Sequence, residues 1–203
     1  MRGMRMDALA SLIDRATTAL QERLTETEYE HSLGVAATAR MLASIYEYDD
    51  EDDAYLAGLL HDWDKCRSNE ELLADAEEYG IEITDIIKAN PRLLHAHTGA
   101  RAVSHTFPRL APEIIEAIEN HTIGAVPMTD LDRIVYIADM IEPARDQEGV
   151  GDLRGLVGIA DLDTLFFRCY QRSLEGLVVR CKVIHPDTAK VWNWLLATFD
   201  AHE

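Results

Sequence analysis

The chain has 203 residues, 47% of them hydrophobic, and a formal net charge of −18, a balance typical of a soluble globular protein of one domain with a substantial core. Within residues 47–85, 15 acidic side chains stand against only Lys65 and Arg67, which argues against a nucleic-acid binder and against an anionic membrane surface as partner. Taken at face value, this excess of negative charge also argues against a polyphosphate ligand.

Apolar residues recur at helical spacing along the first half of the chain, and no stretch alternates strictly enough to predict a strand. A first helix is expected over residues 6–21. Thr25 and Glu28 have the spacing of a capping box, so a second helix should run to about Tyr46, with His31 on its buried face. The further helices expected in this half cover residues 50–63, 70–79 and 84–89.

The second half of the chain continues the helical pattern. Prolines fit the first turns of two helices, one over residues 92–107 and one from Pro112 to about His121. Further helices are expected over residues 130–141, 161–182 and 186–199. The predicted fold class is therefore all-α, with one domain over residues 25–200 and an N-terminal helix within residues 1–24 as part of it.

Three cysteines form no Cys-x-x-Cys pair, so neither a disulfide framework nor a cysteine zinc site is expected. Asp7, Ser11 and Asp14 interrupt the N-terminal segment, which therefore lacks the apolar run of a signal peptide. No other segment reaches the ~18 apolar residues of a membrane span. A cytoplasmic protein without a membrane partner is expected.

Two carboxylates interrupt apolar segments. His61 and Asp62 end one such run, where a buried charge is costly unless a cation or hydrogen-bond donors neutralise it. A metal ligand pair and a hydrogen-bonded helix end are both open there. Asp139 lies inside the apolar helix of residues 134–141, where the alternatives are a metal ion and a salt bridge to an arginine. No basic residue stands at helical spacing close to Asp139.

Four histidines follow in the middle of the chain. His121 ends a helix, a place where the helix dipole by itself favours histidine. His95 and His97 cannot share one helical face, so only one of them is expected to point inward. We expect His97 and His105 to be exposed helix histidines, which leaves His95 as the inward-facing member.

The inward-facing histidines and aspartates form an ordered set along the chain. Mixed imidazole and carboxylate donors suit iron, manganese, cobalt or zinc better than magnesium or calcium alone. Six donors are too many for one open catalytic ion and enough for two if one aspartate bridges, and such a pair generates hydroxide at neutral pH and clamps a phosphoryl group. The candidate metal ligands are His31, His61, Asp62, His95, His121 and Asp139.

This set resembles the HD-domain superfamily of metal-dependent phosphohydrolases. The segments that flank these residues are more specific. They read EHSLGV at 30–35, AGLLHD at 57–62, LLH at 93–95, IENHT at 118–122, IVYIADMIEP at 134–143 and IHPDT at 184–188. Over about residues 25–197 these segments resemble the YqeK family of symmetrical bis(5'-nucleosyl)-tetraphosphatases.

The resemblance implies a single HD-domain helical bundle with a dinuclear metal site that holds two divalent ions. It implies iron as the metal, with manganese, cobalt or zinc as alternatives. It implies cleavage of diadenosine tetraphosphate into two ADP by attack of a metal-bound hydroxide on phosphorus. A small nucleotide is then the partner, and a homodimer is left open. By the same resemblance, one ion is held by His31, His61, Asp62 and Asp139, and the second by His95 and His121, with Asp62 bridging.

Asp62 and Lys65 are the catalytic residues that the resemblance implies. Substrate contacts are expected from Lys65, Arg145, Thr122 and His185, although a surface salt bridge is the alternative for Lys65 and Arg145.

Two positions depart from the family pattern. Relatives often carry arginine where Ala125 stands, so a substrate contact of that arginine would be missing here. Asp64 replaces a small residue and could weaken phosphate binding or orient a metal water. The alternative functions are an HD-type nucleotidase or phosphodiesterase acting on another nucleotide, and a nucleotide-binding sensor with little turnover.

Overall fold

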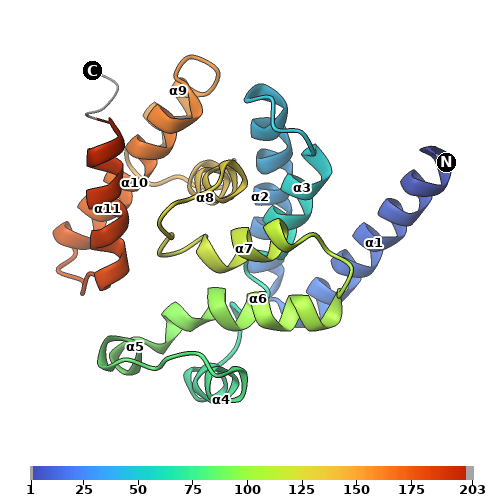
Figure 1. Cartoon of the computed structure of the whole chain (residues 1–203), viewed down its shortest axis with the longest axis horizontal. Coiled ribbons are helices and arrows are strands. Elements are labelled where there is room, and N and C mark those ends of the chain that lie inside the picture. The colour runs from blue at the N-terminus through green and yellow to red at the C-terminus, as the bar shows by residue number, and fades with distance from the viewer. Residues whose placement is uncertain (1, 200–203) are drawn as a thin grey trace.

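The computed structural model describes residues 2–199, with side chains for residues 9–198, and this part of the chain consists of helices and turns without a strand (Figure 1). The predicted all-α fold class is therefore confirmed. In chain order the helices are α1 (Arg2–Arg23), α2 (Glu26–Ile45), α3 (Glu51–Leu60), α4 (Asn69–Tyr79), α5 (Asp85–Ala89), the 3-10 helix η1 (Pro91–Leu94), α6 (His95–Thr106), α7 (Pro112–Asn120), α8 (Asp130–Ile141), α9 (Val150–Leu156), α10 (Leu162–Val179) and α11 (Pro186–Phe199).

The core lies where α2, α3, α7 and α10 pack around α8, which runs through the middle of the bundle (Figure 1). Leu42, Leu59 and Ile134 are fully buried there. Burial of one such aliphatic side chain stabilises the fold by about 1.5–3 kcal/mol. The apolar run of α8 is buried on nearly all sides, as its sequence predicts, and this helix carries Asp139 into the bundle.

A close approach of two backbones sets the position of the first histidines. A Cβ atom at Gly58 in α3 would lie 3.0 Å from the Cα atom of Ala36 and from the carbonyl oxygen of Val35 in α2. Only a residue without a side chain fits there, so α2 and α3 pack at backbone distance. This contact brings the end of α3, with His61, beside His31 on α2.

The N-terminal helix belongs to the same packed structure. Ala16 and Leu20 of α1 are fully buried within the main core cluster. A smaller cluster beneath α4, α5 and η1 contains Leu72, Ile87 and Leu94, and it fixes the chain just before α6 begins. The domain limits at residues 24 and 200 stay predictions.

Several helix ends differ from their predicted places. Helix α3 ends at Leu60, because the amides of Trp63, Lys65 and Arg67 bond to carbonyls three residues back and tighten the chain into turns. The Pro91 segment is a 3-10 helix, so α6 begins only at His95. Helix α9 was not predicted, since its glycines interrupt the apolar pattern.

None of the described helices combines the length and the apolar composition that a membrane span requires. All three cysteines are free, as expected from their number and spacing. Cys66 and Cys181 are exposed, whereas Cys169 is buried in α10.

The buried thiol gives a direct test of the core. Burial raises the pKa of Cys169 to about 12, and the thiolate is the reactive form. We expect a thiol reagent at pH 8 to modify Cys66 and Cys181 in the native protein and to leave Cys169 unmodified. Peptide mass spectrometry after timed labelling measures this, with urea-unfolded protein as the control in which all three react. Rapid native labelling of Cys169 would contradict this packing.

Candidate metal centre

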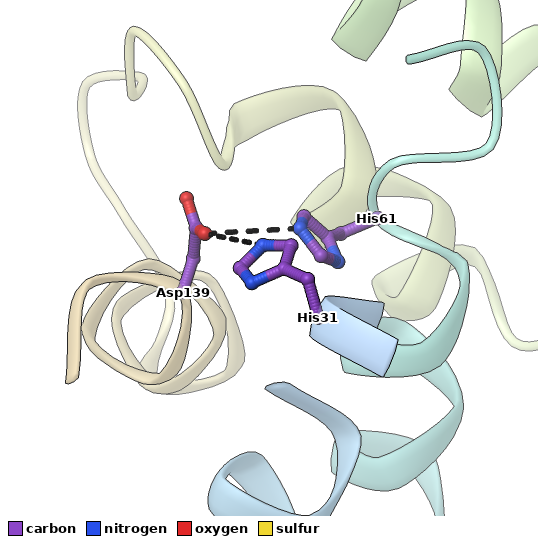
Figure 2. A group of neighbouring side chains, drawn as sticks. All are labelled: His31, His61 and Asp139. Atoms are coloured by element: carbon purple, nitrogen blue, oxygen red, sulfur yellow. Dashed lines mark ion pairs between the residues drawn. The ribbon is translucent and has the colours of Figure 1, made fainter. Parts of the chain in front are cut away.

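The six candidate metal ligands come together in one cluster. Figure 2 shows three of them, His31 from α2, His61 from the end of α3 and Asp139 from α8. The Nε2 atom of His31 lies 3.0 Å from Oδ1 of Asp139, and Nε2 of His61 lies 3.9 Å from the same oxygen. His95 opens α6 and His121 follows α7, and both face Asp62, which itself lies in the turn after α3.

All four imidazoles present the same nitrogen to the centre. The Nδ1 atoms of His61, His95 and His121 lie 2.6–2.7 Å from carbonyl oxygens three residues back. A carbonyl only accepts, so each Nδ1 donates and each Nε2 keeps its lone pair. Carbonyls in the last turn of a helix lack helical partners, which is why His61 and His121 find acceptors there. Nδ1 of His31 bonds instead to Glu142, at 3.1 Å from Oε1.

Asp62 stands between two groups of donors. Its Oδ1 atom lies 3.1 Å from Nε2 of His95 and 3.4 Å from Nε2 of His121. Its Oδ2 atom lies 3.3 Å from Nε2 of His61 and 3.8 Å from Nε2 of His31. One carboxylate oxygen therefore faces each group, which is the arrangement that a bridging ligand requires.

The donor set fits metal ions. Nε2 of His95 and Nε2 of His121 face each other at 3.2 Å, and two lone pairs at that distance repel unless a cation lies beside them. Nε2 of His61 is buried and has no hydrogen-bond partner. Donors that share an ion at about 2.1 Å each lie roughly 3–4 Å apart, as these atoms do. His31, His61 and Asp139 form one group of atoms close enough to hold an ion, and His61, Asp62 and His121 form another.

The ionisation of the cluster also suits metal binding. Burial opposes the charge on Asp62, but the histidines around it hold the pKa of this carboxyl well below its usual value. Burial lowers the pKa of His121 to about 4, so this imidazole is neutral at pH 7. Burial also acts against a charged His31, yet the Asp139 carboxylate raises its pKa. A positive charge is therefore favoured between His31 and Asp139.

An arginine also reaches Asp139, so the salt-bridge alternative is present beside the candidate metal group. Nη2 of Arg145 lies 2.5 Å from Oδ1 of Asp139, and its Nε donates to the Asp139 carbonyl at 2.8 Å. Arg154 of α9 holds the intervening turn by donating to the carbonyls of Ile141, Glu142 and Arg145. Arg145 is six residues from Asp139 and outside α8, which is why helical spacing missed it.

Asp64 does not face the cluster. Its side chain is 2% exposed, and Oδ1 accepts a hydrogen bond of 2.8 Å from Nη2 of Arg23 at the end of α1. The same guanidinium lies 4.5 Å over the ring of Trp63 and donates to the Trp63 carbonyl at 3.3 Å. Arg23 thus ties α1 to the turn that carries His61 and Asp62, and this contact occupies the Asp64 carboxylate.

The Arg23 contact predicts a stability effect. Arg23→Ala leaves the buried Asp64 carboxylate without its partner and should lower the free energy of unfolding by about 2 kcal/mol, less than for a fully buried pair because the arginine is partly exposed. Urea unfolding measures this. The matched control is Arg15→Ala, which removes an α1 arginine that lies over the Phe107 ring. Equal losses in both variants would refute the role given to Asp64.

The remaining predicted residues divide into two groups. Nζ of Lys65 lies 3.1 Å from Oδ2 of Asp62, and Thr122 lines a cavity beside the centre with a buried hydroxyl that has no hydrogen-bond partner. His185 instead accepts a hydrogen bond from the Asp187 amide and does not line that cavity. Neither His97 nor His105 faces the centre, as expected. His105 is exposed, whereas His97 is half-buried and pairs with Glu119.

Sequence reasoning missed Glu142 as a site residue. Its side chain is 4% exposed and holds His31 through Oε1, while Oε2 accepts from the Ala144 amide at 2.6 Å. A glutamate between a buried helix and Pro143 was the available signal. Carboxylates that orient a ligating imidazole in this way raise its basicity.

Comparison with known proteins identifies the class. A model of the HD domain matches residues 29–144, which include all six clustered side chains, and the chain belongs to the HD domain family. It is 32% identical over 186 residues to the symmetrical bis(5'-nucleosyl)-tetraphosphatase of Bacillus subtilis, a match that covers 91% of this chain and 97% of the relative. The protein of the same name in Staphylococcus aureus is 31% identical, over 90% of this chain and 93% of the relative.

A solved structure agrees with this assignment. The crystal structure of a predicted HD superfamily hydrolase involved in NAD metabolism from Clostridium acetobutylicum matches with a TM-score of 0.86 and 33% identity. The match covers 92% of this chain and 97% of that protein. The resemblance inferred from the sequence motifs is therefore confirmed.

Proposed function

We propose that this chain is a metal-dependent phosphohydrolase that cleaves diadenosine tetraphosphate symmetrically into two ADP. It would cleave related dinucleoside polyphosphates in the same way. The observation that carries the proposal is the similarity to symmetrical tetraphosphatases along 90% or more of the chain. The aligned HD region contains the complete cluster of four histidines and two aspartates.

The proposed cofactor is a pair of divalent ions. Iron is the expected metal, and manganese, cobalt or zinc are the alternatives. His31, His61, Asp62 and Asp139 would hold one ion, and Asp62, His95 and His121 would hold the other. When bound, the ions supply Lewis-acid activation of water and of the phosphoryl group. The lone pairs at Nε2 of His61, His95 and His121 and the divided contacts of Asp62 support this assignment.

The chain's own residues have distinct proposed roles. Asp62 orients the donors by offering one oxygen to each half of the cluster. Lys65 pairs with this carboxylate and, with its side chain 27% exposed, is able to reach a substrate phosphate. Arg145 and Thr122 line the adjoining cavity and would contact the polyphosphate. His185 does not line that cavity, and its contact with the substrate stays a prediction.

The activity is tested by loading the protein with iron or manganese and separating the products of diadenosine tetraphosphate hydrolysis. ADP as the sole nucleotide product is expected. Release of ATP with AMP would contradict symmetrical cleavage. Hydrolysis of deoxynucleoside monophosphates instead of diadenosine tetraphosphate would favour another HD-type nucleotidase. Tight ADP binding with no hydrolysis under any metal would favour a nucleotide-binding sensor. The homodimer and the cytoplasmic location stay predictions.

A further inference from the structure

Two arginines of the α10 segment line the cavity beside the candidate metal centre. The cavity has a volume of about 370 Å³, and its wall includes His121 and Asp139 of the cluster. On the α10 side it is lined by Arg172 and Arg180, residues to which neither the sequence motifs nor the proposed chemistry assigns a role. The volume lies within the range of small-ligand sites.

The sequence of α10 places these two guanidinium groups on one face. Residues 172, 176 and 180 are spaced by four and therefore lie one above the other on the helix. A Cβ atom at Gly176 would lie 3.0 Å from Nη1 and 3.2 Å from Nη2 of Arg180. Because Gly176 has no side chain, the Arg180 guanidinium occupies the space beside it. At Arg172, a Cβ atom on Gly149, whose φ is +85°, would lie 3.1 Å from Nε.

The two arginines differ in their partners. Arg172 donates to the Glu148 carbonyl and lies 3.9 Å from a carboxylate oxygen of Glu175. Arg180 makes no side-chain hydrogen bond or ion pair with any residue in the described part of the chain, although acidic residues outnumber basic ones by 37 to 19. The helix dipole favours a cation at the end of α10, but it does not require the guanidinium to lie over Gly176.

We propose that Arg172 and Arg180 bind the phosphates next to one nucleoside of the substrate, while the central phosphates lie at the candidate metal centre. This inference rests on the proposed function. Symmetrical cleavage breaks the central anhydride bridge, which lies two phosphates from either nucleoside. A cation site in the same cavity, apart from the metal centre, would hold the nucleoside end of the substrate. The central anhydride bridge would then lie at the metal centre, where it is cleaved. Guanidinium groups suit phosphate oxygens through paired hydrogen bonds.

The test compares single alanine variants of manganese-loaded protein. We expect Arg180→Ala and Arg172→Ala each to weaken ADP binding about tenfold, as loss of a hydrogen bond to a charged group does. The KM for diadenosine tetraphosphate should rise by a similar factor with kcat little changed, because contacts remote from the reacting bond contribute equally before and during the reaction. Isothermal calorimetry and steady-state kinetics measure the two effects.

The matched control is Arg168→Ala. Arg168 is an exposed α10 arginine that bonds to Gln171 and does not line this cavity, so its loss should leave ADP affinity unchanged. Gly176→Val keeps Arg180 but fills the space beneath it, and it should weaken ADP binding as well. Melting temperatures of all variants establish that each is folded.

The outcomes separate this inference from the proposed function. Normal hydrolysis and ADP affinity in Arg180→Ala and Arg172→Ala would overturn the phosphate contacts and leave the function standing. ADP binding that depends on Arg180, in a wild-type protein that does not hydrolyse the tetraphosphate, would support the contacts and refute the hydrolase. Equal weakening by Arg168→Ala would also overturn the inference, since it would show only a general charge effect.

Discussion

Asp62→Ala is expected to yield a folded protein that retains neither metal ion and has no measurable hydrolase activity. Asp62 is the residue whose two oxygens face both halves of the cluster, at 3.1 Å from His95 and 3.3 Å from His61. Loss of a partner that merely orients a ligand costs about 10–100-fold in metal affinity or activity, so loss of the shared ligand should cost more. Elemental analysis and diadenosine tetraphosphate hydrolysis measure the two effects.

The control for Asp62 is its neighbour Asp64. Asp64→Asn keeps an oxygen that accepts from Arg23 and changes a carboxylate that faces away from the cluster. This variant should keep its metal content and its activity. Circular dichroism should show native helix content in both proteins. An Asp62→Ala protein that still contains about two ions per chain would exclude the bridging role.

Local pattern was sufficient to predict most of the helices and the cluster. His61 and Asp62 were recognisable because they interrupt an apolar run, and the structure shows why both can face inward. Both residues lie in the turns after Leu60, beyond the end of α3, and Nε2 of His61 lies 3.3 Å from Oδ2 of Asp62. His97 was separable from His95 by helical geometry alone.

Contacts between segments far apart in sequence were beyond such reasoning. Arg23 reaches Asp64 across 41 positions, and nothing in the local sequence of α1 indicates that partner. Arg145 meets Asp139 only because the chain turns at Pro143 and Arg154 of the unpredicted α9 holds that turn. Helix α9 itself has no local signature beyond seven residues that include two glycines. These features follow from tertiary packing, which overrides weak local propensity.

The structure shows how a chain with a net charge of −18 can still present positive charge at one place. A polyphosphate would be repelled by the chain as a whole, but the proposed ions are the largest local charges at the cluster, and Arg145, Arg172 and Arg180 line the adjoining cavity. Nucleotide binding is thus attributed to the positive charge of the proposed ions and the cavity arginines, and not to the charge of the whole chain. From the acidic stretch of residues 47–85, three side chains lie at the cluster, namely His61, Asp62 and Lys65.

The two halves of the cluster should also be separable by mutation. His95→Ala removes a donor from one side of Asp62, and His31→Ala removes a donor from the other. Each variant is expected to retain about one ion per chain, because the opposite side keeps its own histidines and one Asp62 oxygen. Activity should fall at least about 100-fold in both, since two-ion chemistry needs both ions. Elemental analysis counts the ions, and electron paramagnetic resonance of manganese-loaded protein distinguishes an isolated ion from a coupled pair.

His97→Ala is the matched control for this pair of variants. His97 lies two residues from His95 on α6, and its Nδ1 atom pairs with Glu119 at 3.2 Å, away from the cluster. Its removal should change neither the ion count nor the resonance spectrum. A His95→Ala protein with an unchanged ion count would show that His95 is not a ligand. Loss of both ions from His95→Ala would show that the halves do not bind independently, and Asp62 would then belong to one cooperative site.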